Sequence, residues 1–198
     1  MSNIIEMSSM SQNNSGYLEL IIGPMYAGKT SKLLEIYKQC QFCNIPVSII
    51  NHKIDNRYHD TMMSSHDKLM APCVQTDKLT NVWYDVLYEI KSSDVILINE
   101  GQFFNDLYAV VVDMLKNNKK VYICGLDGDF KREKFGQILD LIPLCDKVTK
   151  LTSLCSICKD GTPGIFTLRL TDEKQQTIVG SDNYIPVCRK CYNNKTTV

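Results

Sequence analysis

A short loop near the start of the chain carries the residues whose chemistry is easiest to interpret. It fits the phosphate-binding pattern G-x-x-x-x-G-K-[ST] and consists of Gly23, Pro24, Met25, Tyr26, Ala27, Gly28, Lys29 and Thr30. In such a loop the glycines let backbone N–H groups face phosphates, the lysine neutralises β/γ charge and the hydroxyl ligates Mg²⁺. The loop follows an expected strand at 17–22 and precedes an expected helix at about 30–41, as the motif requires. The chain is therefore predicted to bind a nucleoside triphosphate with Mg²⁺.

Two cysteine pairs in the C-terminal part have the spacing of a metal site. Cys155 and Cys158 form one C-x-x-C pair, and Cys188 and Cys191 form the other. Four thiolates in this arrangement fill the tetrahedral shell of a structural zinc ion and leave no open position for chemistry. The remaining cysteines lack a matching second pair and are interpreted as core residues: Cys40, Cys43, Cys73, Cys124 and Cys145.

The stretch DVILINEGQFF, residues 94–104, ends an apolar run with a polar pair. Its apolar residues lead directly into Asn99 and Glu100. A carboxylate at the end of a buried strand is either a solvated charge or a group placed to accept a proton. Nucleotide-binding strands usually carry Asp where Asn99 stands, and Asn keeps an acceptor oxygen but lacks the negative charge. Because the phosphate loop alone fits a switch, a motor or a small-molecule kinase, the strand ends must distinguish these classes.

Apolar runs and helical periodicity alternate along the chain. Strands are expected at 17–22, 47–50, 95–98 and 121–124, and helices at about 30–41, 82–90 and 107–115. The segment 51–80 has little periodicity and is expected to be mostly a long loop. Such alternation predicts an α/β fold with a mainly parallel sheet, helices on both faces and ligands at the carboxyl ends of the strands.

Changes in composition divide the chain into expected parts. Residues 1–16 are rich in Ser and Asn and are expected to be disordered, as is the tail at 193–198. The α/β nucleotide-binding domain is expected at 17–150. A smaller zinc-binding domain, with paired cysteines and Gly/Pro turns, is expected at 151–192.

Charge and hydropathy exclude several classes of function. Lys and Arg number 22 and Asp and Glu number 22, so the net charge indicates neither nucleic acid nor a membrane surface as a partner. The N-terminus lacks the pattern of a secretion signal, and no apolar run is long enough to span a membrane. We expect a soluble, cytoplasmic protein whose nine cysteines are thiols rather than disulfides.

Several motifs, in this order, resemble those of the type II thymidine kinases, the cellular and poxvirus-like family with a zinc-bound lasso. They are GPMYAGKT, DNRY (55–58), SHD (65–67), NEGQFF (99–104), LDGDFKREKFG (126–136), LTSLCSIC and NYIPVCRKCY. The resemblance implies a RecA-like P-loop NTPase sheet with a C-terminal zinc-ribbon or lasso domain. It also implies transfer of the γ-phosphoryl group of ATP to the 5′-hydroxyl of thymidine or deoxyuridine. A homotetramer inhibited by dTTP is a further implication.

The resemblance assigns roles to the residues around the phosphates. Glu100 matches the proposed general base of the family, and Asn99 stands where the family usually has the Asp that supports Mg²⁺. Asn99 is therefore expected to support the metal more weakly. Asp55 and Arg57 match a segment near the phosphates. Gln102 is expected to be a further ATP- or Mg²⁺-binding residue.

The resemblance also places the thymine base in an apolar slot closed by the lasso, which reads the base through its main chain. The zinc ion would fix both ends of that loop. The matching positions are Met25, Phe103, Leu126, Phe130, Phe135, Thr167, Gln176, Ile178, Val179, Gly180 and Tyr184.

Two other functions fit many of the same residues. One is a catalytically weakened nucleotide-binding zinc protein, which the neutral Asn99 would suit; the other is a kinase for a different deoxynucleoside. Lys29, Glu100 and the aromatic slot occur together, which favours an active enzyme because a pure binding protein has no need of Glu100.

Overall fold

A parallel sheet forms the centre of the computed structural model, which describes residues 15–54, 62–64, 70–85, 90–176 and 183–196. Within these residues the sheet has six strands in the order β5-β2-β6-β7-β1-β8, all parallel to their neighbours. Their bounds are β1 Tyr17–Ile22, β2 Val47–His52, β5 Val74–Thr76, β6 Val95–Asn99, β7 Lys120–Gly125 and β8 Lys147–Lys150. The predicted α/β fold with a parallel sheet is confirmed.

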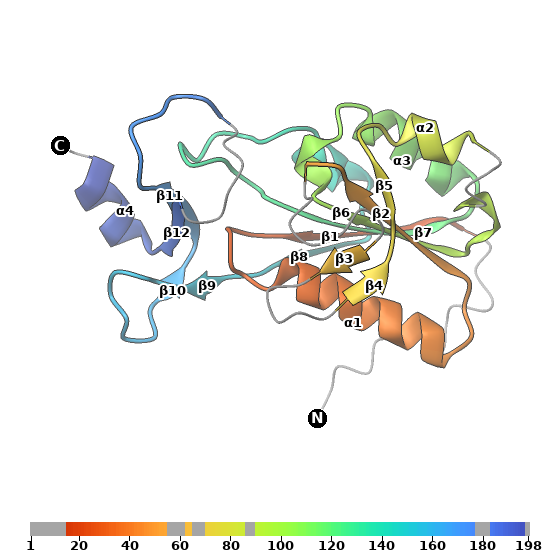
Figure 1. Cartoon of the computed structure of the whole chain (residues 1–198), viewed down its shortest axis with the longest axis horizontal. Coiled ribbons are helices and arrows are strands. Elements are labelled where there is room, and N and C mark those ends of the chain that lie inside the picture. Colours follow the sequence, from red (N-terminus) through yellow and green to blue (C-terminus); the bar gives the residue numbers. More distant parts are fainter. Residues whose placement is uncertain (1–14, 55–61, 65–69, 86–89, 177–182, 197–198) are drawn as a thin grey trace.

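Helices cover both faces of the sheet (Figure 1). Helix α1 (Lys29–Phe42) buries an apolar face against one side, where its Leu33 and Leu34 share a core with Leu97 of β6. Helix α3 (Leu107–Lys116) packs on the other side, together with α2 (Thr80–Trp83) and the 3-10 helices η3 (Ile90–Ser92) and η5 (Ile138–Leu144). Successive strand side chains point to opposite faces, so every buried strand contributes to both cores. Each fully buried Leu or Ile contributes about 1.5–3 kcal/mol.

The segment 51–80 contains more regular structure than the sequence predicts. Strand β3 (Met62–Ser64) pairs antiparallel with β4 (Met70–Pro72), and β5 extends the main sheet beside β2. The prediction of a mostly irregular loop missed these strands, because strands of three residues are too short to show an alternating pattern. Strand β8 and helix η5 were also absent from the expected elements. The helix expected at about 82–90 is α2 followed by η3, and residues 86–89 lie outside the described ones.

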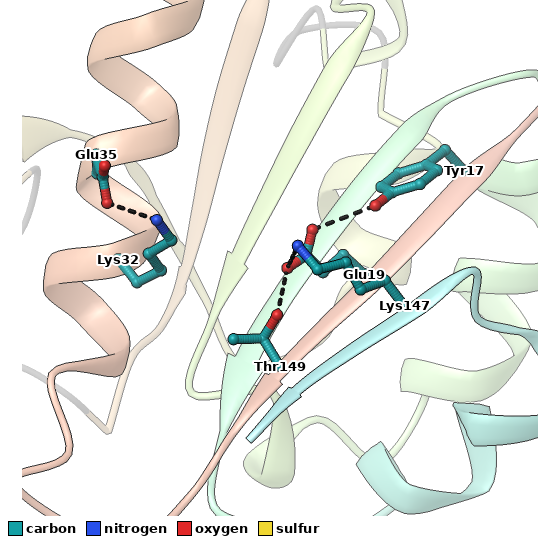
Figure 2. Close-up of polar contacts among 6 residues, drawn as sticks. All are labelled: Tyr17, Glu19, Lys32, Glu35, Lys147 and Thr149. Carbon is teal, nitrogen blue, oxygen red and sulfur yellow. Dashed lines mark hydrogen bonds and ion pairs between the residues drawn. The ribbon is translucent and has the colours of Figure 1, made fainter. Parts of the chain in front are cut away.

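A buried carboxylate fixes the edge strand β8 to β1. Glu19 of β1 is 5% exposed and accepts hydrogen bonds from Tyr17 Oη (3.2 Å) and Thr149 Oγ1 (2.6 Å). Lys147 Nζ lies 3.2 Å from the same carboxylate, and Figure 2 shows these groups converging on it. Burial and the Glu19 carboxylate raise the pKa of Tyr17, so its phenol remains a donor. The strand that leads into the C-terminal region is thereby held in register.

The C-terminal region forms its own small core at one end of the molecule (Figure 1). Strand β9 (Ser153–Leu154) pairs with β10 (Pro163–Gly164), and β11 (Phe166–Arg169) pairs with β12 (Tyr184–Val187). Helix α4 (Arg189–Thr196) follows, with Tyr192 buried in that core. Residues 193–196 are therefore helical, whereas a disordered tail was expected from 193, because α4 continues beyond its buried anchor. The described residues include no helix with the length and apolarity needed to cross a membrane.

Candidate active site

The phosphate loop joins the end of β1 to the start of α1 through a backbone that favours glycine. Gly28 has φ 78°, in the left-handed region, and the next residue, Lys29, begins the helix. A Cβ on Gly23 would lie 2.4 Å from the carbonyl oxygen of Leu151, so a side chain does not fit there. Lys29 Nζ donates to the carbonyl oxygen of Pro24 at 2.7 Å. The loop and helix start have the arrangement that the motif predicts, with the N-terminal end of α1 behind the loop.

Asn99 ends β6 in a network of neutral groups. It is fully buried, and its Oδ1 accepts from Cys124 Sγ at 2.8 Å and, at a long 3.4 Å, from Thr30 Oγ1. Its Nδ2 donates at 2.7 Å to Oδ1 of Asn51, which lies opposite Asn99 on the neighbouring strand β2. A hydroxyl and a thiol can both donate to an amide oxygen, and with this orientation Nδ2 also finds its acceptor on Asn51. The acceptor of Asn99 is thus fixed toward the threonine of the phosphate loop.

Glu100 follows β6 in a strained conformation. Its φ of 56° and ψ of 41° are left-handed, which costs a residue with a side chain roughly 1–2 kcal/mol. Gln102 Nε2 donates to Glu100 Oε2 at 2.6 Å, and Gln102 Oε1 accepts from the N–H of Leu126 at 3.0 Å. Such strain is typical of functional sites. The buried Gln102 side chain, within the 3-10 helix η4 (Gly101–Phe103), therefore orients the carboxylate.

His52 is a site neighbour that the sequence analysis missed. Its ring centroid lies 5.5 Å from that of Phe103 and 4.8 Å from that of Phe104, and its Nδ1 accepts from the N–H of Ile54. Burial lowers the pKa of His52, although Asp77 and Asp106 act in the opposite direction. Asn51 and His52 directly follow the expected strand at 47–50. The strand-end rule that singled out Asn99 could have identified both.

The predicted base-slot residues fall into two groups. In the first, beside Glu100, the rings of Phe103 and Phe135 meet edge to face at 5.4 Å, and Leu126 is tied to Gln102. Met25 approaches from the phosphate loop, where its N–H donates to Thr167 Oγ1 of β11 at 3.0 Å. The structure thus brings predicted residues from distant parts of the chain to the same strand ends.

The second group lies where β11 and β12 meet the segment 126–136. Arg169 lies over the Phe130 ring and donates to Tyr184 Oη, while Gln176 Nε2 donates to Asp129 Oδ2 at 2.9 Å. Arg169 and Asp129 were not predicted, because nothing local to either residue indicates its long-range partners. The predicted residues Asp55, Arg57, Ile178, Val179 and Gly180 lie outside the described ones.

The paired cysteines come together as predicted. All four Sγ atoms lie within 4.8 Å of one another, with Cys158 Sγ 3.8 Å from Cys188 Sγ and 3.4 Å from Cys191 Sγ. Tetrahedral Zn–S bonds of about 2.3 Å place sulfur atoms about 3.8 Å apart. The N–H of Cys158 points to Cys155 Sγ and that of Cys191 to Cys188 Sγ, each at 3.5 Å. This cluster has the ligand type and spacing to hold a structural zinc ion.

Comparison with known proteins agrees with this geometry. The family model described as thymidine kinase matches residues 16–192. The chain belongs to the thymidine kinase family. The thymidine kinase of sheeppox virus (strain KS-1) is 40% identical over 179 residues, covering 89% of this chain and 97% of the relative. That of variola virus is 41% identical over 181 residues, covering 90% and 98%.

A plant member of the thymidine kinase family is equally similar. The thymidine kinase of Oryza sativa subsp. japonica is 42% identical over 187 residues, covering 89% of this chain and 66% of the longer relative. The family resemblance inferred from the sequence motifs is confirmed. Family membership, together with a phosphate loop whose Thr30 contacts Asn99 beside Glu100, favours an enzyme over the alternative of a degenerate binding protein.

Proposed function

We propose that this chain is an ATP-dependent thymidine kinase. It transfers the γ-phosphoryl group of ATP to the 5′-hydroxyl of thymidine, and of deoxyuridine, to give the monophosphate. The observation that carries the proposal is the contact of Thr30, in the phosphate loop after β1, with Asn99, the residue before Glu100, in a member of the thymidine kinase family. Phosphoryl transfer requires positioning, charge stabilisation and an oriented nucleophile, and these residues can supply all three.

The loop at 23–30 binds the phosphates in this proposal. Its backbone N–H groups and the N-terminal end of α1 bind the triphosphate, and Lys29 exchanges the Pro24 carbonyl for a phosphate oxygen. Thr30 Oγ1 and Asn99 Oδ1 are hard oxygen donors on adjacent elements, which suits Mg²⁺ directly or through water. The bound Mg²⁺ neutralises charge on the phosphates. Asp55 and Arg57 remain proposed phosphate-side residues, and Gln102 acts through Glu100.

Glu100 acts as general base in this proposal. Its carboxylate accepts the proton of the sugar 5′-hydroxyl as the oxygen attacks the γ-phosphorus. The hydrogen bond from Gln102 Nε2 fixes one carboxylate oxygen, so the orientation of the base is set before the nucleoside arrives. The left-handed backbone at Glu100 ends the extended course of β6 directly after Asn99.

The nucleoside half is formed by the aromatic slot and the lasso. Phe103, Phe135 and Leu126 offer apolar surface to a flat ring, with Met25 and Phe130 beside them. The lasso reads the base through main-chain groups, and Thr167 and Tyr184 support it from β11 and β12. The remaining proposed lasso contacts are Gln176, Ile178, Val179 and Gly180.

A zinc ion on the four thiolates has a structural role in this proposal. It joins the turn at 155–158 to the start of α4 and so fixes both ends of the lasso. The division into a nucleotide-binding domain at 17–150 and a zinc-binding domain at 151–192, the homotetramer, dTTP inhibition and cytoplasmic location also remain proposals.

The direct test is product formation. Incubation with ATP, Mg²⁺ and thymidine should give dTMP and ADP in equal amounts, as measured by chromatography. ADP released without dTMP would indicate an ATPase and contradict the proposal. Bound ATP with neither product would instead support the weakened nucleotide-binding protein.

A further inference from the structure

We propose that Arg169 is a positioning residue for thymidine recognition, because its guanidinium group holds the first limb of the lasso, residues 173–176, against Phe130 and Tyr184. The inference rests on the proposed function, since it concerns the nucleoside half of the same site. Arg169 ends β11, opposite Tyr184 of β12, and is only 7% exposed.

The guanidinium group caps several carbonyls of a limb that has no regular hydrogen bonding of its own. Nη1 donates to the carbonyl oxygens of Glu173, at 2.8 Å, and Gln175. Nη2 donates to the carbonyl oxygen of Gln176 at 3.0 Å and to Tyr184 Oη at 2.5 Å. One rigid planar group therefore sets the relative positions of three peptide units and a substrate-side tyrosine.

The guanidinium group also stacks on the ring of Phe130, which lies outside the lasso. The guanidinium carbon lies 3.6 Å from the centroid of the Phe130 ring and 5.1 Å from that of Tyr184. Cation–π contacts of this kind gain strength when the cation is desolvated, as Arg169 is. Tyr192 of α4 donates to the carbonyl oxygen of Phe130 at 2.7 Å. Arg169 thus joins the lasso to a segment that is itself anchored.

Gln176, whose carbonyl oxygen accepts from Arg169, makes a second contact through its side chain. Gln176 Nε2 donates to Asp129 Oδ2 at 2.9 Å, and Asp129 is only 6% exposed. Asp129 Oδ1 accepts from the N–H groups of Lys131 and Glu133, at 2.8 and 3.0 Å, which fixes the carboxylate. Gln176 is therefore held through its carbonyl by Arg169 and through its side chain by Asp129.

This arrangement has a consequence for base recognition. The proposed main-chain readers at 178–180 begin two residues after Gln176. Main-chain recognition depends on a fixed backbone, because each N–H and C=O group must meet its partner at a defined distance. Loss of the guanidinium group should weaken thymidine binding and leave ATP binding at the phosphate loop intact.

The test compares Arg169→Met and Arg169→Lys with the matched control Arg189→Met. Arg189 of α4 also faces a ring, that of Phe166 at 4.9 Å, but is itself exposed. Arg169→Met should raise the KM for thymidine about tenfold or more, with the KM for ATP and the zinc content unchanged. Arg169→Lys keeps the charge but loses the planar fork and should fall between wild type and Met. Arg189→Met should match wild type.

Hydrogen exchange of the lasso peptides gives a readout independent of activity. Amides at 170–176 and 183–184 should exchange faster in Arg169→Met than in wild type, whereas those of α1 should not change. An unchanged thymidine KM together with unchanged exchange would overturn the role of Arg169, and so would equal increases in the KM values of both substrates. If wild type forms no dTMP, the proposed function fails, and the exchange comparison still decides whether Arg169 holds the limb.

Discussion

The two halves of the site are positioned in different ways. On the phosphate side, the chemical groups lie at the ends of strands: the loop follows β1, Asn99 ends β6 and Glu100 follows it. On the base side, contacts join remote parts of the chain, as between Met25 and Thr167 or between Gln176 and Asp129. The phosphate side depends on the sheet, whereas the base side depends on individual side chains and on the cysteine cluster. A substitution on one side should therefore impair the function of that side and leave substrate binding on the other side unchanged.

The largest expected effect is on the chemical step. Glu100→Gln should lower kcat by on the order of 10²–10⁴-fold, because the amide cannot accept the hydroxyl proton. Binding of ATP, measured by calorimetry, should match wild type because the phosphate loop is untouched. Wild-type turnover in this variant would remove Glu100 from the mechanism.

Loss of the zinc site should abolish thymidine binding without affecting ATP binding. Cys191→Ser should lower the zinc content from about one ion per chain, measured by metal analysis, because structural zinc needs all four ligands. Thymidine binding should be lost, whereas ATP should still bind, because the sheet has its own cores. The matched control is Cys43→Ser, because Cys43 lies outside the cluster and is exposed, so its interpretation as a core residue is wrong. Intact thymidine binding without zinc would show that the base side does not depend on the cysteine cluster.

Asn99→Asp changes the charge on the phosphate side only. The carboxylate should reduce the Mg²⁺ concentration needed for half-maximal activity severalfold. Without Mg²⁺ it should destabilise the protein, because a buried charge would face Asn51 Oδ1. Each kcal/mol lost should lower the Tm by about 2–4 °C in Mg²⁺-free buffer without a chelator, which keeps any structural zinc in place. An unchanged Mg²⁺ requirement would show that the neutral Asn99 is already sufficient.

The smallest expected effect is on pH dependence. The pKa of His52 is lowered from 6.5 in the folded state, chiefly by burial, so folding favours the neutral ring. Its stabilising contribution is complete above pH 6.5 and is lost as the pH falls through the folded pKa. Thermal denaturation between pH 7.5 and 5 should show a steeper loss of Tm in wild type than in His52→Gln. Parallel curves would rule out this contribution.

The same contrast explains what could be predicted from the sequence. The expected strands at 17–22, 47–50, 95–98 and 121–124 are all present, because buried parallel strands form continuous apolar runs with polar residues at their ends. The cysteine cluster followed from spacing. Strands β3, β4 and β5 were missed because they are too short to show periodicity. Arg169 and Asp129 were missed because their partners are set by tertiary packing rather than by neighbours in sequence.

Substrate choice tests the central claim most directly. The measurement is kcat/KM with ATP·Mg²⁺ for thymidine, deoxyuridine, deoxycytidine and deoxyguanosine under one set of conditions. We expect thymidine and deoxyuridine to be preferred, because the aromatic slot and the lasso select the base while the phosphate side treats every 5′-hydroxyl alike. Equal or higher values for deoxycytidine or deoxyguanosine would contradict it and indicate a kinase for another deoxynucleoside.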